Sequence, residues 1–125
     1  MEQINLEKAT AQQVFDYVVR KLFEQGCKST VSNDGDLHCA YRGNDGTKCA
    51  GGWLIRDEQY NPKMEGYSWM VVVGMYDLCS NHMDLVTDLQ DIHDSYGTQD
   101  WRKAFKYVAE KHHLNTKILE EVEIS

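Results

Sequence analysis

A chain of 125 residues with 42% hydrophobic and 26% charged residues is long enough for one domain with a buried core, and its composition excludes a disordered tail. Its 20 acidic residues outnumber its 13 basic residues, and the net charge of −7 disfavours direct binding to nucleic acid or to an anionic membrane and favours a protein partner with a basic surface. The first residues hold no apolar run after a basic start, and no stretch approaches membrane-spanning length, so we expect a cytoplasmic protein without a signal peptide.

The first predicted element is a helix that begins after Thr10 and ends at Gly26. Thr10 and Gln13 have the spacing of a capping box, and six apolar residues then recur at helical spacing, namely Val14, Phe15, Val18, Val19, Leu22 and Phe23. Residues 28–36 are polar and are expected to form a loop.

A hairpin is predicted next, with strands 37–42 and 47–50 around the sequence Gly-Asn-Asp-Gly. The commonest three-residue loop places Gly46 in the left-handed region and sets a register in which Gly43 pairs with Thr47. In the same register Tyr41 pairs with Cys49 and Cys39 pairs with Gly51.

Two cysteines then share one face of this hairpin. Cys39 and Cys49 become diagonal neighbours with Cα atoms about 7–8 Å apart, which is long for an unstrained disulfide but allows both thiolates to reach one metal ion.

The last part of the chain is predicted to be mainly helical. Residues 67–77 form a β-branched apolar run that propensity assigns to a buried strand, with a buried helix as the alternative because Gly74 weakens the strand. Helical stripes follow over residues 85–96 and 101–112, and a short helix ends the chain. The sequence therefore predicts one domain over residues 1–125, with a helix-rich α+β fold of three to four helices packed on a small β-hairpin or antiparallel sheet.

Four residues have the chemistry of a zinc site, namely Cys39, Cys49, Cys79 and His82. Cys79 and His82 have the short spacing of two ligands that come from one turn. Cys39 and Cys49 are separated by nine residues, and they lie on the same face only if the hairpin has the predicted register. The favoured interpretation is that no cofactor is bound and that Cys39 and Cys49 are buried core thiols.

A catalytic interpretation makes Cys49 a nucleophile with His93 as its base, and His82 as a second candidate base. It requires a helix that begins directly after Cys49, because a helix N-terminus lowers a thiol pKa. Gly51 and Gly52 disfavour that helix. His93 also lies on an apolar stripe, where a hydrogen-bonded core histidine is the favoured interpretation.

A row of aspartates and a group of aromatic residues are the candidate partner-binding residues. Asp84, Asp88, Asp91 and Asp94 recur every three or four residues along one predicted helix face, which suits a basic partner but is also typical of a solvated face. Tyr60, Tyr67 and Trp69 are typical interface anchors if they are exposed and core residues if they are not.

The sequence from Cys39 to Gly66, CAYRGNDGTKCAGGWLIRDEQYNPKMEG, together with LQDIHDSYG and DWRKAFKYVAEKHHL further on, resembles a family of small uncharacterised proteins of bacteriophages and bacteria. The shared pattern is CxYRGxDGxKCAxGxLIxDxxYxPxMEG, and the similarity extends over residues 39–114. The resemblance implies a phage or bacterial cytoplasmic setting, and it implies no particular activity. Cys79 and His82 lie outside the shared pattern.

Small size, acidic charge, the lack of a coherent catalytic set and this resemblance together favour a non-enzymatic phage accessory protein. We expect it to bind and modulate, by inhibition, a bacterial host protein such as a defence or nucleic-acid-handling factor. The alternative is a zinc-stabilised domain or a Cys-His enzyme centred on Cys49.

Overall fold

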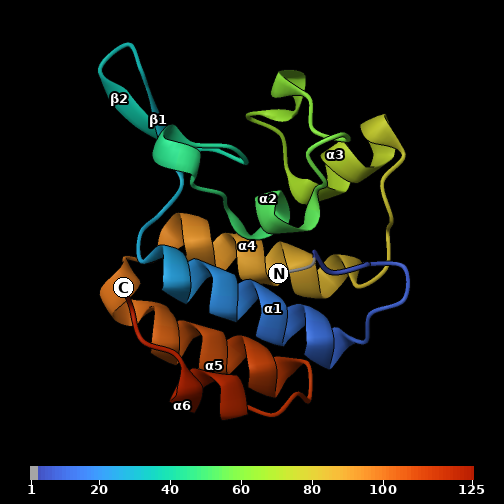
Figure 1. Ribbon diagram of the computed structural model, residues 1–125, viewed down its shortest axis with the longest axis vertical. Helices are drawn as coiled ribbons and strands as arrows, with labels where there is room; N and C mark the ends of the chain where they lie inside the picture. The colour runs from blue at the N-terminus through green and yellow to red at the C-terminus, as the bar shows by residue number, and fades with distance from the viewer. Residues whose placement is uncertain (1–2) are drawn as a thin grey trace.

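The computed structural model describes residues 3–125, which form six α-helices and one two-stranded antiparallel sheet (Figure 1). The helices are α1 (Ala11–Gln25), α2 (Ala50–Leu54), α3 (Trp69–Tyr76), α4 (Met83–Ser95), α5 (Trp101–Lys111) and α6 (Lys117–Glu121), and the strands are β1 (Thr30–Asn33) and β2 (Asp36–Cys39). The predicted helix-rich α+β fold is confirmed. The helices outnumber the predicted ones because residues 50–54 and 69–76 are also helical.

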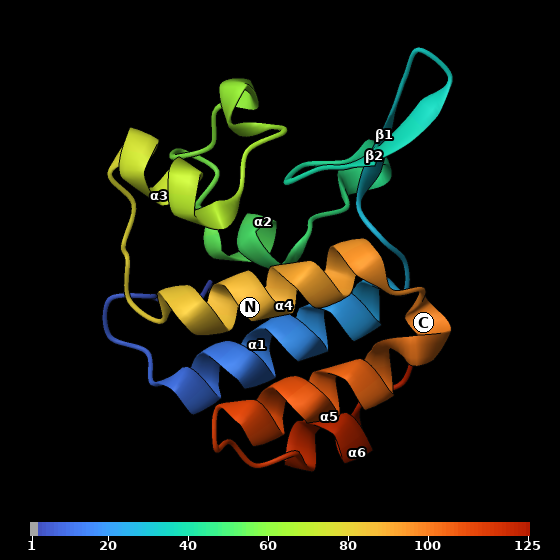
Figure 2. The same cartoon turned by 180° about the vertical axis from the view of Figure 1, so that it is seen from behind.

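The long helices form the body of the molecule. In the view of Figure 1, α1 is drawn between α4 and α5, α6 lies at the lower edge, and α2 and α3 lie beyond α4. Helices α4 and α5 also contact each other, and α6 contacts both α1 and α5. Figure 2 shows the same order from behind, with the β-hairpin standing out from the body. Within the part of the chain that the structure describes, no helix combines the length and the apolar character that a membrane crossing requires.

Helix α1 is the centre of the core, and its prediction is confirmed. Thr10 and Gln13 form the capping box, and Gly26 ends the helix in the left-handed region with φ of 77°. The six apolar residues of the predicted stripe are all buried. Phe23 lies against the rings of Trp101 and Phe105, so α1 and α5 share one aromatic cluster.

The hairpin does not lie where the sequence analysis placed it. Residues 30–33, predicted as a loop, pair with residues 36–39 through a two-residue turn in which Asp34 and Gly35 both have positive φ, as a type I′ turn requires. Cys39 therefore pairs with Thr30 and not with Gly51. The prediction failed because Asp-Gly, one of the strongest hairpin signals, occurs in both segments.

The segment predicted as a hairpin keeps its register but forms a single bridge. Arg42 pairs with Lys48, and the N–H of Gly43 donates to the carbonyl of Thr47 over 2.9 Å. Gly46 adopts the predicted positive φ, whereas Asp45 also has a positive φ of 60° and so departs from the expected type I turn.

The apolar run after residue 67 is the helix α3, so the strand prediction is wrong and its helical alternative is right. The Ser68 hydroxyl accepts a hydrogen bond from the N–H of Val71 and caps the first turn. Packing of Trp69, Val72 and Val73 into the core overrides the β-propensity of the valines.

Candidate functional site

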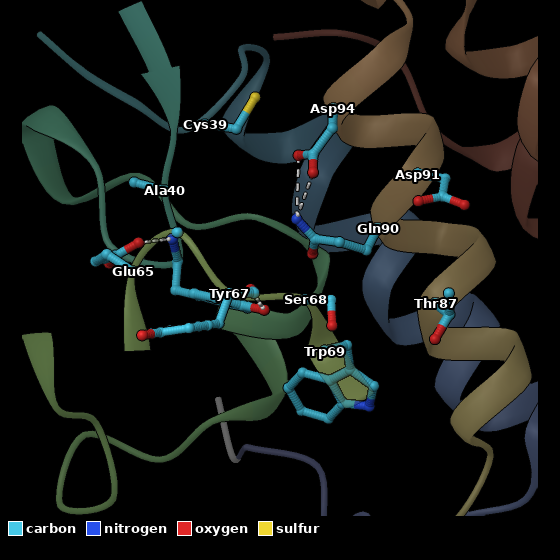
Figure 3. A pocket seen from close by; sticks show the side chains of 12 residues that line it. Cys39, Ala40, Glu65, Tyr67, Ser68, Trp69, Thr87, Gln90, Asp91 and Asp94 are labelled. Atoms are coloured by element: carbon cyan, nitrogen blue, oxygen red, sulfur yellow. Dashed lines mark hydrogen bonds between the residues drawn. The ribbon is translucent and has the colours of Figure 1, made fainter. Parts of the chain in front are cut away.

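A pocket of about 280 Å³ lies between α4 and the chain that leads into α3 (Figure 3). Thr87, Gln90, Asp91 and Asp94 of α4 line one side. The opposite side is formed by residues 65–69, and Cys39 lies at one end. The pocket thus combines carboxylates and polar groups with aromatic surface.

His93 and Asp94 anchor a buried polar network beside this pocket. The Nε2 atom of His93 accepts the backbone N–H of Ser29 over 2.9 Å, so the ring proton resides on Nδ1, which donates to Asp94 over 2.8 Å. The amide of Gln90 donates to Asp94 and accepts the N–H of Gly51. One turn of α4 therefore holds the base of the hairpin and the start of α2.

The charge state of Asp94 follows from these bonds. Partial burial raises the pKa of Asp94, but the hydrogen bonds from His93 and Gln90 outweigh it, and the net pKa is lowered. Asp94 is thus a carboxylate whose hydrogen-bonding capacity is largely used inside the protein. It belongs to the network that holds the hairpin and α2 to α4, although its side chain is still 39% exposed at the pocket.

Cys39 lies next to Asp94 but is not an activated thiol. Burial, the charge of Asp94 and a hydrogen bond to it together raise the pKa of Cys39. A nucleophilic cysteine needs a base beside it, and here the carboxylate lies between the thiol and His93.

The zinc alternative is not supported by the positions of its residues. Within residues 3–125, Cys39, His93 and Asp94 are the only group of three potential ligands within 4.8 Å of one another, so the predicted set of Cys39, Cys49, Cys79 and His82 does not come together. His82 bonds instead to the carbonyl of Ala9 over 2.8 Å.

The group that does come together does not fit a metal ion either. A metal on Nδ1 of His93 would move the ring proton to Nε2, where it would face the N–H of Ser29. In the arrangement that the structure shows, these residues form a hydrogen-bonded network.

Cys49 is also buried, although the helix required by the catalytic interpretation exists. Cys49 is the N-cap of α2, so the objection drawn from Gly51 and Gly52 is wrong. Burial nevertheless raises the pKa of Cys49 to about 12, against the lowering contributed by hydrogen bonds with Gly52 and Gln90. The thiol has no access to solvent and remains protonated at neutral pH.

Alkylation tests this placement of the cysteines. After brief treatment of the folded protein with iodoacetamide at about pH 8, we expect mass spectrometry to find the exposed Cys27 modified and Cys49 intact. In urea, Cys49 is expected to react like Cys27. Labelling of Cys49 in the folded protein at the rate of Cys27 would show that its thiol is reactive and accessible.

The residues of the family-like pattern form a clamp around Glu65, which the sequence analysis did not single out. The Glu65 carboxylate accepts the N–H groups of Tyr41 and Arg42 over 2.8 and 3.1 Å and the hydroxyl of Tyr60 over 2.6 Å. The Arg42 guanidinium donates to Asp57 over 2.7 Å and lies over the Tyr60 ring. This part of the pattern fixes the irregular chain before α3.

The predicted acidic row is divided between two roles. Asp88 faces α5 and bonds to Lys111 and His112 over 2.9 and 2.7 Å, so its charge is paired within the protein. Its role as a partner contact stays a prediction. Asp84 and Asp91 are exposed, and within the described residues neither forms an ion pair. Partial burial and the charges of Asp88 and Asp94 raise the pKa of Asp91.

The predicted aromatic anchors also differ from one another. Trp69 is only 2% exposed, so it is a core residue and not an exposed anchor. Tyr60 is half-buried and its hydroxyl donates to Glu65, and its role as an anchor stays a prediction. Tyr67 is 50% exposed and remains a candidate anchor.

The net charge is distributed unevenly along the chain. Residues 64–101, which contain α3 and α4, hold seven of the 20 acidic residues and none of the 13 lysines and arginines. The rest of the chain holds 13 of each sign, so this segment accounts for the whole net charge of −7.

Comparison with protein-family models, with curated proteins and with solved structures gave no match. The resemblance to phage and bacterial proteins therefore stays a prediction.

Proposed function

We propose that this protein is a non-enzymatic accessory protein that binds a host protein through the acidic side formed by α3 and α4. The observation that carries the proposal is the confinement of the net charge to residues 64–101. Asp84 and Asp91 are the carboxylates on α4 that form no ion pair or hydrogen bond in the described chain, although Lys111 on α5 is close enough for its charge to act on both. Tyr67 lies across the pocket from Asp91.

Electrostatic steering gives this arrangement its specificity. An unpaired acidic surface accelerates encounter with a basic surface and repels acidic partners, and the effect weakens as salt rises. The same charge opposes binding to phosphates, so the partner we propose is a basic protein and not nucleic acid itself.

The resemblance to phage and bacterial proteins supplies the setting. Proteins that handle nucleic acid carry basic surfaces, and an acidic protein that covers such a surface would inhibit them. We therefore propose a bacterial defence or nucleic-acid-handling protein as the partner, in the cytoplasm of the host.

Charge reversal tests this proposal. Tagged wild-type protein is used to capture partners from host lysate, beside an Asp84→Lys/Asp91→Lys variant and a control with Glu110→Lys and Glu120→Lys. The control changes the net charge by the same amount, but its two positions lie outside the acidic segment.

We expect quantitative mass spectrometry to find a basic protein with the wild type and the control, and at least about tenfold less of it with the α4 variant. If both variants captured equally little of this protein, the loss would be due to the total charge and would contradict a role for the α4 surface in particular. Undiminished capture by the α4 variant would contradict the proposed surface.

A further inference from the structure

The outer side of α3 is apolar and exposed. Together with Tyr67, three residues of this helix lie on one stripe at helical spacing, namely Met70, Val71 and Met75. Met70 and Met75 are 63% and 53% exposed. The helix itself contains no charged residue, and a helix that is apolar all round is normally covered on every side.

We propose that this α3 face, defined as Tyr67, Met70, Val71 and Met75, receives the apolar side of a basic amphipathic helix of the partner. The inference rests on the proposed function and names the part of the partner that is recognised. Methionine side chains suit this role because they adapt to different apolar surfaces.

The charges around the α3 face select a basic occupant. Asp77 ends α3 and lines a second pocket in which it and two glutamates, Glu7 and Glu58, outnumber one cation, Arg56. Asp91 of α4 lies across the first pocket from Tyr67. Lysine or arginine residues beside the apolar stripe of a partner helix would therefore meet carboxylates.

The same charges argue against two other occupants. A second copy of this chain docked through the same surface would bring together two acidic segments that themselves hold no lysine or arginine. An anionic membrane surface would be repelled in the same way.

The shape of α3 matches a short helical contact. Its eight residues extend over about 12 Å, which two turns of a partner helix cover. A Cβ atom at Gly74, in the middle of the stripe, would meet nothing within 4 Å, so a partner side chain finds open space there. Anchors at positions i, i+3 or i+4, and i+7 of the partner fit this face.

Selection of peptides tests the inference without knowledge of the partner. A displayed library of helical peptides, random on all faces, is panned against the full-length protein, and the enriched peptides are then synthesised. We expect them to combine an apolar stripe with flanking lysine or arginine, and NMR titration is expected to shift the amide signals of α3 more than those of α5.

Two variants locate the binding of these peptides. Met70→Gln/Met75→Gln is expected to weaken it at least about tenfold. Leu37→Gln/Tyr107→Gln, which replaces side chains that are 72% and 68% exposed elsewhere, is expected to leave it unchanged. Both variants are expected to keep the melting temperature of the wild type, because all four positions are largely exposed.

The outcomes separate this inference from the proposed function. Enriched basic peptides without an apolar stripe, or with binding insensitive to Met70→Gln/Met75→Gln, would overturn the α3 docking face while a basic partner still stands. Enriched neutral or acidic apolar peptides would overturn the basic occupant and the proposed function with it. No enrichment over a charge-matched unrelated protein would also overturn the docking face.

Discussion

Gly52→Ala is expected to lower the free energy of unfolding by about 2–3 kcal/mol, although alanine favours a helix over glycine by about 1 kcal/mol. The added Cβ would collide with the backbone oxygen of Tyr41 and lie 3.1 Å from the Cβ of Lys48. The backbone of Tyr41 cannot retreat easily, because Glu65 holds its N–H. Helix α2 would have to move away from the chain that it packs against.

Gly74→Ala is the matched control for this prediction. Gly74 also lies in a helix, but a Cβ there meets nothing within 4 Å, so the substitution is expected to raise the free energy of unfolding by about 0.5–1 kcal/mol. Urea denaturation followed by circular dichroism measures both. A free energy of unfolding for Gly52→Ala that is unchanged, or raised as in Gly74→Ala, would contradict the close approach of α2 to Tyr41.

His93→Leu is expected to destabilise the protein by about 3 kcal/mol, despite the similar size of the two side chains. The change leaves the buried N–H of Ser29 without an acceptor and removes a donor from Asp94. The hairpin is expected to loosen from α4 as a result.

Amide hydrogen exchange tests this prediction locally. In His93→Leu, exchange of the Ser29 amide is expected to accelerate, relative to the wild type, more than exchange of the α1 amides. His38→Leu is the control, because His38 is exposed on β2, and it is expected to change stability by less than about 0.5 kcal/mol. A His93→Leu variant with wild-type stability would show that the network around Asp94 does not hold the hairpin.

Helix periodicity made most of the fold predictable. The stripes of α1, α4 and α5 are long and regular, and each helix buries the predicted side. The local sequence did not show which of the two Asp-Gly segments, residues 34–35 or residues 45–46, forms the hairpin turn, because both have the residues that such a turn needs. The valines of α3 led to the wrong prediction of a strand, because packing in the core overrides their local preference for β-structure.

The candidate site was partly visible in the sequence. The spacing of Asp84 and Asp91 placed them on one helix face, but the pairing of Asp88 with α5 depends on a tertiary contact that no local pattern contains. Burial of Trp69 likewise follows from how α3 docks. The confinement of the net charge to residues 64–101 needed no structure, and counting charge by segment would have found it.

Photo-crosslinking in bacterial cells tests the central claim most directly. A photoreactive phenylalanine analogue is placed at Tyr67, which belongs to the α3 face and lies across the pocket from Asp91. In a second variant it is placed at Tyr107 on α5, which is also largely exposed. The account predicts that Tyr67 yields a crosslink to a protein with a basic surface, that Asp84→Lys/Asp91→Lys removes it, and that Tyr107 yields none to that protein. Crosslinks of equal yield from both positions, or a partner with an acidic surface at Tyr67, would contradict it.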